Sequence, residues 1–354
     1  MGLFTKSAKS FDLAFKIKKI KTKQKALATS ADGNKRFPYC PTCHSRNVVH
    51  NFRISSMKQI LVFFSILIFS LSYAQEVALD TLVDIGGYNM HFKIMEGKGT
   101  PILFESGAGD DGSVWDAILK HVHEVTGTTV ISYDRSGFGK SELNPYYKSD
   151  DQFGILNGII ELETGLKKLE YFGDVILVSH SYGGFYTTLF SVRNHEKVKY
   201  NVRVDANLAG QYTEEILVKA EQDNSVQEMK SKHLGMYYLG VNFANTVRLM
   251  WKTKYPETVP AIDIVSPIKR HHTDDEWELL IRTHDDFVNE EPNRTGIIAY
   301  GSGHYIFKDN PGLVLNTIVK TFVNTLIDED KKLEILSKSV NKSIELFIEQ
   351  KKKE

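Results

Sequence analysis

The chain has 354 residues, of which 42% are hydrophobic and 25% charged, a composition typical of a soluble globular protein long enough to bury a large core. It holds 44 Lys/Arg and 44 Asp/Glu, but residues 1–56 contain 12 of the basic and 2 of the acidic side chains, so the remainder is acidic. An acidic main body lacks the electrostatic footprint of a nucleic-acid-binding protein, and we expect no nucleic-acid partner.

Residues 1–56 form a basic N-terminal extension, which we interpret as a segment outside the native protein. Both cysteines of the chain lie here, and Cys40 and Cys43 resemble half of a zinc ribbon. A closed zinc site needs four ligands. His44 and His50 could complete the set, but the adjacency of Cys43 and His44 disfavours it. We therefore expect neither a metal nor a cofactor.

Residues 57–74 have the pattern of a signal peptide. A short basic start is followed by the apolar run 60–71 and by Ser72-Tyr73-Ala74, a small-x-small cleavage pattern. The run is shorter than the roughly 20 residues of a membrane span. We expect a mature chain from Gln75, secreted or periplasmic. The alternative is a short membrane anchor, and contact with a membrane is expected only through this segment.

From residue 76 short apolar runs alternate with amphipathic segments, which is typical of an α/β fold with a mostly parallel sheet flanked by helices. A hairpin is expected around Gly86-Gly87. Buried strands are expected at 101–104, 128–133, 175–178, 198–204, 259–265 and 295–300. Helices are expected at 115–122, 155–169, 185–192, 273–288 and from 311 onward.

The main body is expected to span residues 75–327, with a cap inserted in it and a helix after it. The connection at about 207–258 is far longer than the 2–6 residues usual between a strand and its neighbour. Its helical pattern and its aromatic side chains predict a cap over the strand ends. Residues 328–354 are charged and amphipathic, and predict a C-terminal helix packed on the body or on a partner.

A nucleophile elbow is predicted at Ser181. The serine follows the buried strand 175–178 and precedes a helix, and the residues that flank it, Ser179, Gly183 and Gly184, are small enough for a tight turn. The pattern is G-x-S-x-G with Ser179 in place of the first glycine.

Three other motifs accompany the elbow in a specific order. Ser106-Gly107-Ala108-Gly109 follows a strand, the loop 134–141 has the pattern Asp-Arg-x-Gly-x-Gly-x-Ser, and a late strand ends in Gly301-Ser302-Gly303-His304. Over about residues 81–327 this set resembles the α/β-hydrolase superfamily, in its serine-nucleophile branch with a helical lid. The resemblance implies an α/β-hydrolase fold.

His304 is the candidate general base, and Asp205 the candidate acid that orients it. A serine hydroxyl needs a neighbouring base, and His304 lies in a glycine-flanked loop at the carboxyl edge of the sheet. In the α/β-hydrolase superfamily, which the set of motifs resembles, the acid follows one of two strands after the elbow. Asp205 ends the first of these strands, while Asp263 and Asp274 are the alternatives.

The resemblance also implies an oxyanion hole and a reaction. The backbone N–H groups of Ala108 and Tyr182 correspond to the oxyanion donors. Asp134 and Arg135 are expected to brace the loops. The function predicted is a serine hydrolase, carboxylesterase-like (EC 3.1), that cleaves an ester, thioester, lactone or amide through an acyl-enzyme on Ser181.

Two alternatives stay open at this point. An acyltransferase would use the same triad, and a ligand-binding or receptor-like homologue would keep the triad with little turnover. Epoxide hydrolases and haloalkane dehalogenases of this fold use an aspartate nucleophile, and Ser181 argues against both. The expected partner is a small-molecule acyl substrate. Its identity and the oligomeric state do not follow from the sequence.

Overall fold

A single eight-stranded sheet organises the part of the chain that the computed structural model describes, residues 78–270 and 273–352. The expected N-terminal extension and signal peptide lie outside these residues. The strand order is β1-β2-β4-β3-β5-β6-β7-β8. The first two pairs, β1–β2 and β2–β4, are antiparallel, and all later pairs are parallel. The strands are β1 (Leu79–Asp84), β2 (Asn89–Met95), β3 (Ile102–Glu105), β4 (Val130–Tyr133), β5 (Val175–His180), β6 (Val198–Val204), β7 (Ala261–Val265) and β8 (Arg294–Ile298).

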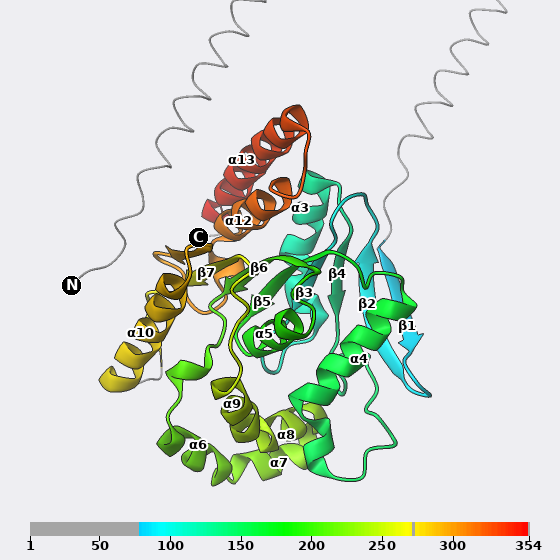
Figure 1. The fold of residues 1–354 in the computed structure, drawn as a ribbon, viewed down its shortest axis with the longest axis vertical. Coiled ribbons are helices and arrows are strands. Elements are labelled where there is room, and N and C mark those ends of the chain that lie inside the picture. Colours follow the sequence, from blue (N-terminus) through cyan, green and yellow to red (C-terminus); the bar gives the residue numbers. More distant parts are fainter. Residues whose placement is uncertain (1–77, 271–272, 353–354) are drawn as a thin grey trace, which may run out of the picture. The chain divides into compact units, whose positions relative to one another are not determined.

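Helices cover both faces of the sheet, which confirms the predicted fold class (Figure 1). One face packs against α4 and α5, and the other against α3 and α12, on which α13 packs in turn. None of the described helices is both long and apolar enough to cross a membrane. The helices are α3 (Asp116–Thr126), α4 (Ile155–Lys168), α5 (Gly183–Arg193), α6 (Glu214–Glu221), α7 (Ser225–Lys232), α8 (Leu234–Val241), α9 (Phe243–Trp251), α10 (Asp274–Glu290), α11 (Ile306–Asp309), α12 (Pro311–Val323) and α13 (Glu329–Lys351). Short 3-10 helices lie at Gly112–Trp115 (η2), Asp150–Phe153 (η3) and Ala209–Gln211 (η4).

The central strand β5 shows why its sequence is an unbroken apolar run. Val175 and Leu177 belong to the core on the α4–α5 face, whereas Ile176 and Val178 belong to the core on the α3–α12 face. Successive side chains of a strand point to opposite faces, so a strand covered on both sides needs apolar residues at every position. β5 continues two residues past the predicted end, through Ser179 and His180.

The insert between β6 and β7 consists of α6, α7, α8 and α9, which lie together beyond one end of the sheet (Figure 1). Its helix α8 packs on loops that follow β3 and β4. A Cβ on Gly235 would lie 2.4 Å from the backbone oxygen of Gly137, and a Cβ on Gly109 would lie 3.4 Å from Met236 Sδ. The insert therefore adjoins the loops in which the sequence places the oxyanion motif and the Asp-Arg loop.

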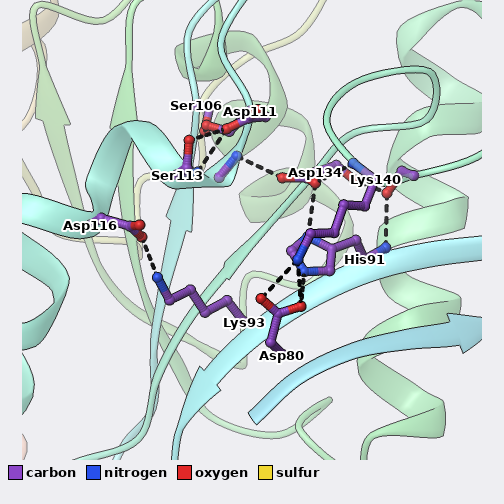
Figure 2. A network of polar contacts seen from close by, with 11 residues as sticks. Asp80, His91, Lys93, Ser106, Asp111, Ser113, Asp116, Asp134 and Lys140 are labelled. Carbon is purple, nitrogen blue, oxygen red and sulfur yellow. Dashed lines mark hydrogen bonds and ion pairs between the residues drawn. The ribbon is translucent and has the colours of Figure 1, made fainter. Parts of the chain in front are cut away.

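The Asp-Arg loop is held by a buried carboxylate, Asp134 (Figure 2). Its oxygens accept hydrogen bonds from the backbone N–H of Gly112 and Lys140, both at 2.8 Å, and one of them lies 2.8 Å from His91 Nδ1. The other ring nitrogen of His91 lies 2.8 Å from Asp80 Oδ1 on β1. These contacts tie the loop after β4 to β2 and to the edge strand β1, as expected for a bracing role of Asp134.

Candidate active site

Ser181 lies at a strained turn between β5 and α5. Its φ of 52° is in the left-handed region, and its backbone oxygen accepts hydrogen bonds from the N–H groups of Gly184 at 2.9 Å and Asn207 at 2.7 Å. A Cβ on Gly183 would lie 2.5 Å from the backbone oxygen of Ser106, so only glycine allows the turn to approach this loop. The serine replacing the first glycine, Ser179, is buried in β5. The local geometry is that of a nucleophile elbow.

Asp205 and His304 are in direct contact. His304 Nδ1 lies 2.7 Å from Asp205 Oδ2, and the backbone N–H of Ser266 donates to Asp205 Oδ1 at 3.0 Å. Burial acts to raise the pKa of Asp205, but the hydrogen bonds from His304 and Ser266 and the charge of Arg270 outweigh it, and the pKa lies below its usual range. Asp205 is therefore an ionised partner for the imidazole.

Backbone strain is concentrated at these positions. Among the described residues, three non-glycine residues have a positive φ: Glu170, Ser181 and Asp205. Such conformations cost about 1–3 kcal/mol each and cluster at functional sites. Two of the three are the candidate nucleophile and the candidate acid.

The two alternative acids lie elsewhere. Asp263 is fully buried, 2.6 Å from His284 Nδ1 and 3.5 Å from Arg203 Nε. Asp274 is exposed at the start of α10 and pairs with Lys269. Both carboxylates thus have other partners, whereas Asp205 contacts His304.

We expect Asp263→Asn to lower stability without removing the chemistry. The substitution leaves Arg203 buried without its ionic partner, and breaking a buried pair costs about 3–5 kcal/mol. Urea unfolding should therefore show a lower midpoint, while kcat per folded molecule on an ester substrate stays near the wild-type value. A loss of kcat larger than about 100-fold in the folded protein would contradict the assignment of Asp263 to the core.

The predicted oxyanion donors flank the elbow. Tyr182 immediately precedes α5, so its backbone N–H lies at a helix N-terminus. Ala108 is exposed in the loop after β3. Arg135 holds this loop, because its guanidinium donates to the backbone oxygens of Ser106, at 2.8 Å, and Gly107.

Arg135 is itself fixed by a buried carboxylate on β3. Its Nη1 lies 2.8 Å from Glu105 Oε1, and both side chains are buried. Burial raises the pKa of Glu105 to about 7, although Arg135 and a hydrogen bond from Tyr133 oppose the shift. The Glu105–Arg135 pair thus positions the carbonyls that precede Ala108, in keeping with the expected bracing role.

Three residues that sequence reasoning left out also lie at the site. Arg270 Nη2 donates to Asp205 Oδ2 at 3.1 Å. His180 is buried beside His304, with ring centroids 4.4 Å apart, and its Nδ1 lies 3.9 Å from Asp110 Oδ2. Loop residues such as Arg270 and Asp110 carry no periodic or spacing signal that would identify them. Within the described ranges, no group of three or more His, Cys, Asp or Glu is placed to hold a metal ion.

Comparison with known proteins identifies the family. A model of the alpha/beta hydrolase family matches residues 102–317, which is more than half of the chain and includes the elbow, the acid and the histidine. The chain belongs to the alpha/beta hydrolase family.

Individual relatives of this alpha/beta hydrolase are distant. YqjL of Bacillus subtilis (strain 168) is 28% identical over 170 residues, 43% of this chain and 64% of YqjL, so the match spans less than two thirds of that protein. A (lyso)-N-acylphosphatidylethanolamine lipase of Bos taurus is 29% identical over 106 residues, 30% of each chain.

Solved structures share the fold. The Cif epoxide hydrolase from Acinetobacter nosocomialis aligns with a TM-score of 0.55 at 15% identity, covering 80% of this chain and 99% of that one. The epoxide hydrolase VrEH1 from Vigna radiata aligns with a TM-score of 0.52 at 15% identity, covering 72% and 99%. At these identities the likeness shows a common architecture.

Proposed function

We propose that this alpha/beta hydrolase is a serine hydrolase that cleaves an ester, thioester, lactone or amide through an acyl-enzyme on Ser181. His304 takes the proton of the Ser181 hydroxyl and delivers it to the leaving group. Asp205 orients the imidazole and stabilises the imidazolium. The backbone N–H groups of Ala108 and Tyr182 stabilise the oxyanion. A water activated by His304 then releases the acid.

The observation that carries the proposal is the contact between Asp205 and His304 beside the strained turn of Ser181, whose backbone oxygen accepts from the N–H of Asn207 at 2.7 Å. Ser181 has a φ of 52° and Asp205 a φ of 47°, and Asp205 Oδ2 lies 2.7 Å from His304 Nδ1. The name of the bovine relative, a lipase, is in keeping with acyl chemistry. The epoxide hydrolases among the solved neighbours share the fold, but a serine at the elbow favours an acyl-enzyme over the aspartate chemistry of that class.

Pre-steady-state kinetics with 4-nitrophenyl esters tests the proposal. Mixing the enzyme with excess 4-nitrophenyl butyrate should give a burst of nitrophenol that approaches one equivalent per active site, because an ester with so good a leaving group acylates the serine faster than water releases the acyl group. A steady release after the burst indicates a hydrolase. A burst with no further release indicates the ligand-binding alternative, and release that requires an added alcohol acceptor indicates an acyltransferase. No burst and no turnover on a panel of acyl groups would contradict the proposal.

We also propose that the chain is exported and that its mature form begins near Gln75. Support comes from the sequence pattern of residues 57–74. The membrane-anchored form is the alternative.

A further inference from the structure

His180, the residue before the candidate nucleophile, has a ring nitrogen with no hydrogen-bond partner among the described residues. Its Nε2 lies 3.1 Å from the backbone oxygen of His304, and because a carbonyl only accepts hydrogen bonds, Nε2 carries the proton. Burial, with His304 as the next cause, lowers the pKa of His180 to about 3, so the ring is neutral. Nδ1 is therefore an acceptor. It is buried and has no hydrogen-bond partner among the described residues.

The group facing this nitrogen is a second acceptor. Asp110 Oδ2 lies 3.9 Å from His180 Nδ1, too far for a hydrogen bond and close enough for one donor atom to reach both. Asp110 accepts a hydrogen bond from the hydroxyl of Tyr305 at 3.2 Å, which leaves further lone pairs of the carboxylate free. In the described part of the chain no Lys or Arg forms an ion pair with Asp110, whose side chain is only 20% exposed.

The gap between the two acceptors adjoins the nucleophile. A Cβ on Gly107 would lie 2.8 Å from His180 Nδ1, 3.2 Å from Asp110 Oδ2 and 3.1 Å from Ser181 Cβ. Glycine at position 107 thus keeps the space beside all three groups free of a side chain. The neighbouring Ala108 is exposed, whereas Gly107 and His180 Nδ1 are buried. A substituent two or three bonds from a carbonyl carbon attached to Ser181 would reach the gap.

We propose that the gap between His180 Nδ1 and Asp110 Oδ2 is a subsite for a primary ammonium group on the acyl part of the substrate. The inference rests on the proposed function of Ser181 and deepens it, because it selects esters or amides of amino-substituted acids. An ammonium group has three donors, so it can serve both acceptors at once. Its positive charge also offsets a largely buried carboxylate with which no Lys or Arg of the described residues forms an ion pair.

The test uses pairs of esters whose acyl parts are equal in size and differ only in their terminal substituent. 4-Nitrophenyl β-alaninate and butyrate differ by an ammonium in place of a methyl, as do the glycinate and the propionate. In at least one pair the wild-type enzyme should prefer the ammonium member after correction for uncatalysed hydrolysis. In Asp110→Asn, the ratio of kcat/KM within that pair should fall about 10- to 100-fold, as for a lost hydrogen bond to a charged group. Equal ratios in the wild type and in Asp110→Asn would overturn the inference.

Two control variants separate recognition from structure. Tyr305→Phe removes the tether to Asp110 but keeps the carboxylate, so the ratio should stay within about threefold of the wild type. Asp286→Asn makes the same charge change at an exposed site on α10 and should leave the ratio unaltered. A fall of the ratio in Tyr305→Phe equal to that in Asp110→Asn would show that Asp110 serves only to hold the loop.

A separate readout keeps this inference apart from the proposed function. Protection of Ser181 against a fluorophosphonate label by 2-aminoethylboronic acid should be stronger than protection by propylboronic acid, and the difference should vanish in Asp110→Asn. Labelling without this difference would refute the ammonium subsite alone. No labelling of Ser181 would refute the proposed function, and the subsite with it.

Discussion

Ser181→Ala and His304→Ala are each expected to lower kcat by up to about 10⁶-fold, and the double variant is expected to be scarcely worse than either. The reason is that both side chains serve one step, the attack of the Ser181 oxygen on the acyl carbon. Removing the base leaves a hydroxyl that is a poor nucleophile, and removing the hydroxyl leaves a base with nothing to activate. The measurement is the steady-state kcat of the three variants on one nitrophenyl ester.

A matched control is available on the helix that follows the elbow. Ser191→Ala deletes a buried hydroxyl whose hydrogen bond goes to the backbone oxygen of Thr187, within α5. It should change kcat by less than about tenfold, because the hydrogen bond that it removes lies within α5. If instead the losses in Ser181→Ala and His304→Ala multiply in the double variant, the two residues act independently and His304 is not the base of Ser181.

Asp205→Asn is expected to lower kcat by about 10⁴-fold while the protein stays folded. Three donors converge on the Asp205 carboxylate, from His304, Ser266 and Arg270. An asparagine offers one oxygen and an NH₂ group that cannot accept, so one of the donors loses its partner. The imidazole loses both its orienting acceptor and the charge that stabilises the imidazolium.

The comparison of Asp205→Asn with Asp263→Asn separates catalysis from stability. Both substitutions remove a buried carboxylate that faces a histidine Nδ1, at 2.7 Å in one case and 2.6 Å in the other. Asp205→Asn should reduce kcat strongly and change the unfolding midpoint little. Asp263→Asn should lower the unfolding midpoint strongly and change kcat little. Near-normal turnover by Asp205→Asn would mean that another group orients His304.

The sheet could be predicted from the sequence because its central strands are covered on both faces. A run such as Val175 to Val178 is apolar at every position for that reason, and each such run is a strand in the structure. The ends of the strands were less predictable. Ser179 and His180 are polar, which marks a turn in sequence, yet both are buried in β5 because Ser179 bonds to Thr187 and His180 to the backbone of His304.

The candidate site was predictable where a residue type must occupy a fixed place in the fold. The turn at Ser181 demands small neighbours, and Asp205 and His304 end or follow strands that reach the same sheet edge. Arg270 and Asp110 were not predictable, because their positions depend on how loops fold back over that edge. The tautomer of His180 likewise depends on its contact with the backbone carbonyl of His304, 124 residues later in the chain.

Mass spectrometry of the protein after reaction with a fluorophosphonate tests most directly whether Ser181 is an activated nucleophile. We expect one adduct per molecule, located on the peptide that contains Ser181, at a rate that falls sharply in His304→Ala. An unmodified protein, or an adduct on another residue while Ser181 stays free, would contradict the assignment of this chain as a serine hydrolase.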